Sequence, residues 1–240
     1  QDDNNELQHC HTTSWGMSTR MIGAVILGHG DDQGLVLPPR LAPVQLVIIA
    51  IGRGEDGARA IDKAHDLAAK LQAVGVRVQV DDRDESPGFK LNDWELKGVP
   101  LRAELGPRDL EGGHVLLSRR IGETDDRGRP VKEKVGFDDL VGMVPDALDA
   151  YHDTLVDRAR SFRDDNTDAV DDWDAFVERV EFGFAEALHC GRELCEDEIK
   201  AETTATPRAI LIDQDDDAGP CVRCGEDSAY GKRVVFAKAY

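Results

Sequence analysis

Residues 44–80 read VQLVIIAIGRGEDGARAIDKAHDLAAKLQAVGVRVQV and contain a strand, a helix and a second strand in that order. Residues 44–51 are almost entirely apolar, which is typical of a strand that is buried on both faces. Apolar residues then recur at helical spacing, and Gly75 stands where helices commonly end. In residues 76–80 apolar and polar side chains alternate, as they do in strands. The segment therefore predicts a β-α-β unit.

Residues 89–135 extend this unit into a mixed α/β domain. We predict a short helix around Trp94 and two strands, at 101–105 and 114–118, that are split by a turn at Gly106-Pro107. The short strands look antiparallel and do not continue the β-α-β pattern. The fold class expected for this part is a mixed-sheet α/β domain.

Residues 145–190 are predicted to be helical, because apolar residues recur at helical spacing in two stripes that we interpret as core. The two stripes are Leu148, Tyr151, Leu155, Ala159 and Phe162, and Trp173, Phe176, Val177, Val180, Phe184 and Ala187. The acidic run between them, residues 164–174, is interpreted as a solvated loop. Pro38, Pro39 and Pro43 are interpreted as a linker ahead of the first strand.

The composition is strongly acidic. The 240 residues include 32 Asp, 16 Glu, 20 Arg and 9 Lys, and the net charge is −19. This balance argues against a purely electrostatic nucleic-acid binder, although it leaves room for a local basic site. An acidic, Lys-poor surface suits a protein that works in high salt, and GC-rich codon usage would produce the same bias. Both explanations remain open.

The chain shows no targeting or membrane segment. Its first residues are polar and acidic and lack the apolar core of a signal peptide. The longest apolar run, residues 46–51, is too short to cross a bilayer. We therefore expect a soluble, cytoplasmic protein without a membrane partner. Because the first residue is Gln rather than Met, the sequence is interpreted as a fragment.

Residues 52–57, GRGEDG, match the G-x-G-x-x-G fingerprint of dinucleotide-binding folds. The match follows a strand, opens a helix and has Asp81 and Asp82 after the next strand. Glu55 and Asp56 would, however, face the pyrophosphate and repel it. We therefore prefer a glycine-rich turn between strand and helix over a nicotinamide-dependent oxidoreductase.

Residues 11–24, HTTSWGMSTRMIGA, resemble motif 3 of the class II aminoacyl-tRNA synthetases, and the variant with Ser-Trp-Gly before Ser-Thr-Arg resembles the prolyl-tRNA synthetases. Residues 29–40, HGDDQGLVLPPR, are also similar to that family. Residues 92–102 and 104–110 resemble its anticodon-binding domain, in the archaeal-type branch. The resemblance covers nearly the whole chain.

The resemblance implies the residues of an active site that uses ATP with Mg²⁺ and proline. Arg20 is the implied catalytic residue, because a guanidinium can hold the reacting phosphate with two directed hydrogen bonds. Ser18 is expected to contact ATP from the same strand as Arg20. Trp15 is expected to wall the proline pocket, and Gly16 to let a ligand approach the backbone closely.

The same resemblance places Glu95, Arg102 and Arg108 at the surface that binds the anticodon of tRNA(Pro). Arginine suits the acceptor edge of guanine, and a carboxylate suits its Watson–Crick donors. Leu91 stands where the family often has an aromatic residue for base stacking. The alternative, that these charged residues form ion pairs with one another on an ordinary surface, stays open.

Four of the five cysteines form two pairs, Cys190 with Cys195 and Cys221 with Cys224. The C-x4-C and C-x2-C spacings suit a tetrahedral structural zinc, with Gly225 easing the turn after the second pair. Two disulfides, or buried thiols without a ligand, are the alternatives. The archaeal-type C-terminal domain of the family carries such a zinc site. The fifth cysteine, Cys10, lies outside this cluster and is expected to be a buried thiol.

The resemblance therefore implies that the chain is part of a proline–tRNA ligase, which would be a homodimer in its full-length form. Residues 1–40 would end the catalytic domain, 41–144 form the anticodon-binding domain and 145–240 a small zinc-binding domain. The chain contains nothing that resembles class II motifs 1 and 2, so we expect the fragment alone to be inactive. A non-catalytic tRNA-binding zinc module is the competing interpretation.

Overall fold

The computed structural model describes residues 4–9 and 12–238, so Cys10 and His11 lie outside the described residues. The chain forms two compact units that divide between Val156 and Asp157, inside one long helix. No helix among the described residues is long and apolar enough to cross a membrane.

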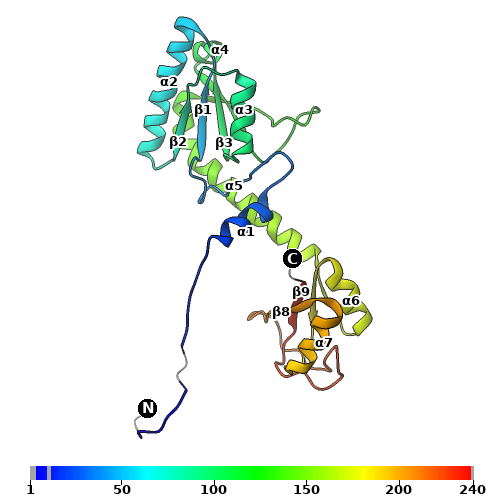
Figure 1. Cartoon of the computed structure of the whole chain (residues 1–240). Helices are drawn as coiled ribbons and strands as arrows, with labels where there is room; N and C mark the ends of the chain where they lie inside the picture. The colour runs from blue at the N-terminus through cyan, green and yellow to red at the C-terminus, as the bar shows by residue number, and fades with distance from the viewer. Residues whose placement is uncertain (1–3, 10–11, 239–240) are drawn as a thin grey trace. The chain divides into compact units, whose positions relative to one another are not determined.

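Unit 1 contains a five-stranded mixed sheet with the strand order β2-β1-β3-β4-β5. Strand β1 runs parallel to β2 and β3, whereas β4 and β5 are antiparallel to their neighbours. Figure 1 shows α2 and α3 flanking the sheet. The elements are α1 Arg20–His29, β1 Leu46–Ala50, α2 Gly54–Ala73, β2 Val78–Asp81, α3 Pro87–Leu96, β3 Leu101–Leu105, α4 Pro107–Glu111, β4 His114–Arg119, β5 Glu133–Gly136 and α5 Phe137–Asp165, which continues into unit 2.

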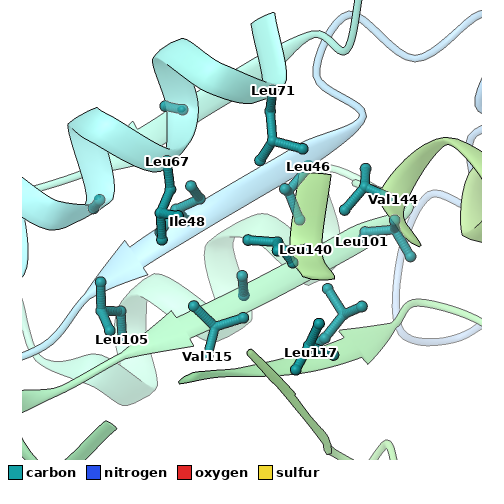
Figure 2. Close-up of a cluster of buried hydrophobic side chains, with 14 of the residues drawn as sticks. Leu46, Ile48, Leu67, Leu71, Leu101, Leu105, Val115, Leu117, Leu140 and Val144 are labelled. Atoms are coloured by element: carbon teal, nitrogen blue, oxygen red, sulfur yellow. The ribbon is translucent and has the colours of Figure 1, made fainter. Parts of the chain in front are cut away.

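The main core of unit 1 lies on one face of this sheet, under α2 and α5. Leu67 and Leu71 of α2 point toward Leu46 and Ile48 of β1, while Leu140 of α5 packs over β3 and β4 (Figure 2). On the opposite face, alternate residues of β1 pack against Trp94 of α3. Because β1 is buried on both faces, its sequence is apolar without alternation.

The structure confirms the two strands and the helix predicted for the first β-α-β unit. The prediction of a plain turn after β3 is wrong. Instead of a plain turn, Pro107 opens the short helix α4, and the Asp109 carboxylate accepts a hydrogen bond from the Gly106 amide at 2.9 Å. This side-chain cap satisfies a backbone donor that a helix start would otherwise leave open. Strand β5 was not predicted.

The glycine-rich segment at the start of α2 is a tight turn, as predicted. Gly52 and Gly54 both have positive φ angles, 145° and 64°. A Cβ at Gly57 would lie 2.7 Å from the carbonyl carbon of Gly52, so only glycine fits this close approach.

The proline-containing segment ahead of β1 does not behave as a free linker. Pro38 and Pro39 are buried, and Arg77 donates hydrogen bonds to the carbonyl oxygens of Pro39 at 2.7 Å and Ala42 at 2.9 Å. The segment is therefore fixed to unit 1 by its backbone carbonyls.

The expected strand that carries Ser18 and Arg20 is absent from the described residues. Residues 12–18 have no regular structure, and Arg20 is the first residue of α1. A strand needs a hydrogen-bonded neighbour, and no described segment pairs with residues 12–18. Within α1 no residue is buried, although most of its side chains are apolar.

Unit 2 contains a four-stranded sheet with the order β6-β7-β9-β8. Phe176 and Val180 of α6 pack on this sheet together with Ile199 of α7. The elements are β6 Thr167–Ala169, α6 Trp173–Phe182, β7 Phe184–Ala187, α7 Glu193–Thr203, β8 Ala205–Ala209 and β9 Val234–Lys238.

Three predictions for this region are wrong in part. Ala159 and Phe162 are exposed rather than core, because α5 extends past the core of unit 1 before it ends. Phe184 and Ala187 belong to β7, since Gly183 ends α6 in an extended conformation. The acidic run is not wholly a loop, because it contains β6 and the capping residue Asp172.

Candidate nucleic-acid interface and metal centre

One face of the unit 1 sheet changes from apolar to charged between β1 and β3. In the register of the two strands, Val47 lies beside Arg102 and Ile49 beside Glu104. Side chains at alternate positions share a face, so Arg102 and Glu104 continue the face that α3 covers over β1. Ser118 of β4 lies directly across from Arg102. This polar face next to α3 is the surface at which RNA contacts were predicted.

Arg102 and Glu95 are brought together at the edge of this face. The Nη1 atom of Arg102 lies 3.2 Å from Oε2 of Glu95 and also donates to the carbonyl oxygen of Leu91 at 3.2 Å. The Arg102 residue is only 3% exposed, whereas the Glu95 side chain keeps 21% of its surface accessible. Arg102 and Glu95 therefore form an ion pair, as the alternative interpretation proposed. The Arg102 guanidinium is buried, although we expected it at the surface.

Arg108 does not join this pair. It lies in α4, beyond the far end of β3 from Arg102, and it is exposed. The strand rises about 3.3 Å per residue, so the two arginines are roughly 10 Å or more apart along the chain direction. Of the two arginines, only Arg108 is exposed to solvent.

The position of α3, which carries Glu95, is fixed by Asp81 at the end of β2. The Asp81 carboxylate is buried and accepts hydrogen bonds from Arg83 at 2.7 Å and from the Trp94 indole at 2.7 Å. Burial alone would raise the pKa of Asp81, but these hydrogen bonds outweigh it and lower the pKa to about 2. The ionised carboxylate is therefore the form that holds α3.

We expect this carboxylate to make unit 1 acid-sensitive. Its folded pKa of about 2 lies below the ordinary value of 3.8, so its contribution is complete above pH ~4 and is lost as the pH falls toward 2. The difference corresponds to roughly 2 kcal/mol of unfolding free energy. Denaturant unfolding at pH 5 and pH 3 should show a smaller difference in Asp81→Asn than in the wild type. Asp82→Asn, which changes an exposed neighbour, should keep the wild-type difference, and equal pH dependence in both variants would contradict this role.

A second set of hydrogen bonds also fixes α3, and the sequence analysis did not predict it. Arg120 is buried at the end of β4, donates to both carboxylate oxygens of Asp31, and reaches the carbonyl oxygen of Glu95 at 3.4 Å. The segment that follows α1 is thereby tied to the end of α3, and the Leu35 amide donates to the Leu96 carbonyl oxygen at 3.1 Å. A pairing across 89 residues leaves no local signal in the sequence.

The four cysteines of unit 2 converge as their spacing predicted. Their sulfur atoms all lie within 4.8 Å of one another, and all four thiols are free. The Sγ atoms of Cys190 and Cys224 are 3.7 Å apart, close to the edge of about 3.8 Å expected for a tetrahedron with metal–sulfur bonds of about 2.3 Å.

Backbone hydrogen bonds hold the two cysteine pairs together. Gly225, with φ 75°, closes the turn of the second pair through a bond from its amide to the Cys221 carbonyl oxygen. The Val222 amide bonds to the carbonyl oxygen of Leu188 at 3.0 Å, and Cys195 sits in the first turn of α7. The ligand geometry is thus set by the surrounding fold.

The ionisation of these thiols also fits a cation site. Burial and then the neighbouring sulfurs of Cys190 and Cys224 raise the pKa of Cys195 to about 12. Burial likewise raises the pKa of Cys221, whereas hydrogen bonds outweigh burial at Cys190 and Cys224 and lower their pKa values, that of Cys224 to about 6. Four thiolates at this separation repel one another, so a bound cation is what allows all of them to ionise together.

The residues implied for ATP and proline lie in the N-terminal part of the described chain. Trp15 is 93% exposed, Gly16 is exposed, and the Oγ atom of Ser18 accepts a hydrogen bond from the Arg20 amide at 3.3 Å. Ser18 and Arg20 are therefore adjacent, but no walled pocket is formed by the described residues around Trp15.

The comparison with known proteins agrees with the two-unit division of the fold. Residues 45–146 match the family model described as the anticodon-binding domain, and residues 173–240 match the one described as prolyl-tRNA synthetase, C-terminal. A curated relative, proline–tRNA ligase 2 of Rhodococcus jostii, is 52% identical over 233 residues, which are 96% of this chain and 47% of the relative. The enzyme of Deinococcus radiodurans is 46% identical over 97% of this chain and 47% of its own length. The chain spans about half the length of the curated relatives it matches.

The solved structures give the same result. The prolyl-tRNA synthetase of Cryptosporidium parvum, crystallised with L-proline and AMP, matches all of this chain and 50% of its own with a TM-score of 0.85 and 33% identity. A second structure of that enzyme, with halofuginone and AMPPNP, matches 92% of this chain and 45% of its own with a TM-score of 0.81 and 31% identity. The chain therefore belongs to the prolyl-tRNA synthetase family and carries its anticodon-binding and C-terminal domains.

Proposed function

We propose that this chain is part of a proline–tRNA ligase, which activates proline with ATP and transfers it to tRNA(Pro). The observation that carries the proposal is the 52% identity to a proline–tRNA ligase over 96% of the chain. The chain would contribute an ATP-binding arginine, anticodon recognition and a structural zinc domain. Because it spans about half of its relatives, the complete reaction is assigned to a longer, homodimeric protein.

The proposed domains are residues 1–40, 41–144 and 145–240, as the family resemblance implies. The first would complete the catalytic site. There Arg20 would hold the α-phosphate of ATP, which the proline carboxylate attacks to form prolyl-adenylate and release pyrophosphate, and Mg²⁺ would help to balance the negative charge of the phosphates. Ser18 would contact the same nucleotide, while Trp15 and Gly16 would face the proline pocket. Their exposure is consistent with a site completed by further protein, since Trp15 has 93% of its surface accessible.

The proposed anticodon contacts follow from the chemistry of guanine. Every proline codon begins with two cytosines, so the last two anticodon bases of every proline tRNA are guanines. A carboxylate accepts from the N1 and N2 donors of guanine, and an arginine fork suits its O6 and N7 acceptors. We assign the first role to Glu95 and the second to Arg108, which is exposed.

Arg102 has a different role in this proposal. Its guanidinium is buried behind Glu95 and donates to that carboxylate and to the Leu91 carbonyl oxygen. An oriented carboxylate loses less conformational freedom when it binds a base. We therefore assign Arg102 to the positioning of Glu95 in the arrangement described here, instead of the direct contact with guanine that the sequence suggested.

The test is binding of the 240-residue chain to tRNA(Pro) and to a tRNA(Pro) with both guanines replaced, at matched salt. The wild type should prefer the authentic RNA, and Glu95→Ala should lose roughly 1–3 kcal/mol of that preference. Arg108→Ala should weaken it by a similar amount, and Arg102→Ala should act like Glu95→Ala.

Two matched variants control for charge. Glu55→Ala and Arg53→Ala alter exposed residues of the same charges at the start of α2, and both should leave the preference unchanged. Equal affinity of the wild type for the two RNAs would reject the proposed anticodon site.

The metal assignment concerns the four cysteines of unit 2. A structural Zn²⁺ held by Cys190, Cys195, Cys221 and Cys224 would have a closed shell of four sulfurs, with no open position for a substrate. The convergence of the four sulfur atoms and their separations support this assignment. When bound, zinc would supply folding free energy rather than catalysis.

A further inference from the structure

The side chain of Arg192 contacts both cysteine pairs of the candidate zinc site. It precedes the first residue of α7 and is separated by one residue from Cys190. Its Nε atom donates to the Cys190 sulfur at 3.4 Å, and its Nη2 atom donates to the Cys224 sulfur at 3.0 Å. One guanidinium therefore touches one sulfur from each pair.

The geometry uses a property that arginine has and lysine lacks. The Nε and Nη2 protons lie on one edge of a planar fork, so they can meet two acceptors at once. Here those acceptors are 3.7 Å apart and come from positions 34 residues apart in the sequence. The guanidinium thus bridges the pairs through their sulfurs, independently of the backbone bonds between them.

The charge balance gives this bridge a function. Four thiolates around one Zn²⁺ leave a net charge of −2 at the site. The first turn of α7 adds Glu193 and Glu196 nearby. Groups that donate to metal-bound ligands orient them and stabilise their charge, and their loss weakens metal binding.

The other arginine of the site provides a contrast. Arg223 lies between Cys221 and Cys224 in the sequence, but its guanidinium turns away from the sulfurs. It pairs with Glu198 at 3.0 Å and Glu202 at 2.8 Å and stacks on Trp173, with 4.4 Å to the ring centroid. Two arginines of equal charge at the same site therefore differ in whether they contact the ligands.

We propose that Arg192 is a metal-retaining residue, whose two N–H···S hydrogen bonds bridge Cys190 and Cys224 and slow the loss of the metal from the four-sulfur site. Arg192 is a positioning residue, since it acts on the ligands and not on the metal. The inference rests on the proposed zinc site.

The experiment follows transfer of zinc from the loaded 240-residue chain to an excess of a coloured chelator. Arg192→Gln removes the charge and the fork, Arg192→Lys keeps the charge, and Arg223→Gln removes an equal charge that does not touch sulfur. We expect Arg192→Gln to transfer its zinc about 10- to 100-fold faster than the wild type. The transfer rate of Arg192→Lys should lie in between, and that of Arg223→Gln should be close to the wild type.

Cobalt provides a second measurement that a general loosening would not reproduce. In the Co²⁺-loaded protein the sulfur-to-metal charge-transfer band should shift in Arg192→Gln and stay in place in Arg223→Gln. The proposal would be overturned if Arg192→Gln transferred its zinc at the wild-type rate. It would also be overturned if Arg192→Gln and Arg223→Gln both transferred zinc faster, and to the same extent. Failure of the wild type to bind zinc at all would instead remove the zinc site itself, before any variant is compared.

Discussion

Replacing Cys221 with serine is expected to release the metal and to unfold unit 2 while unit 1 stays folded. Cys221 is 3% exposed, and its backbone closes the turn that presents Cys224. A serine hydroxyl is a poor ligand for zinc, and three remaining thiolates bind it far less tightly. Structural zinc contributes apparent folding energies of about 10–16 kcal/mol in zinc-finger peptides, far more than a small domain has in reserve.

The measurements are the zinc content per chain and the thermal unfolding profile. We expect about one zinc per chain in the wild type, and in Cys221→Ser the loss of the transition that belongs to unit 2. The two units have separate hydrophobic cores, so the transition of unit 1 should remain. Val222→Ala, which trims the same loop but keeps all four sulfurs, should retain its zinc. A folded unit 2 with four alkylatable thiols and no metal would contradict the assignment.

The parts of the fold that the sequence predicted well are those with a strong local cause. Strand β1 is apolar at every position because both faces are covered, and its boundaries were predicted to within two residues. The four cysteines were identified as one site because short C-x4-C and C-x2-C spacings are themselves the geometry of such sites.

The parts that it missed depend on contacts between distant segments. Strand β5 has the sequence EKVG, in which only Val135 is buried, because β5 lies at the end of the sheet order and exposes Glu133 and Lys134. Such a charged tetrapeptide carries no strand signal of its own. Helix α4 had a local signal that was overlooked, since Asp109 stands three residues after Gly106 at a position from which it can cap the helix.

The candidate anticodon site shows the same division. Family resemblance selected Glu95 and Arg102, but it could not show that the arginine is buried behind the carboxylate. That arrangement depends on how α3 packs on the sheet, which Asp81 fixes through Trp94, one residue before Glu95. Arg192 was missed for a similar reason, because its contact with Cys224 spans 32 residues.

In the complete ligase, Arg20→Ala is expected to lower the rate of proline-dependent exchange of pyrophosphate into ATP by about 10²-fold. The loss of one preorganised donor to a developing negative charge costs on the order of 3 kcal/mol of transition-state stabilisation. Arg20 is suited to this role because it is exposed, opens α1, and lies two residues from Ser18, whose hydroxyl accepts from its amide at 3.3 Å.

The controls separate the loss of phosphate binding from general damage. Arg59→Ala removes an exposed arginine of α2 that pairs with the exposed Asp56 at 3.5 Å, so exchange should be nearly unchanged. Arg20→Lys keeps the charge but loses the two-pronged fork, so it should fall between wild type and Arg20→Ala. Binding of tRNA(Pro) should be the same in all variants, because the proposed anticodon contacts at Glu95 and Arg108 are intact. Near-normal exchange by Arg20→Ala would remove Arg20 from the catalytic site while leaving the anticodon assignment in place.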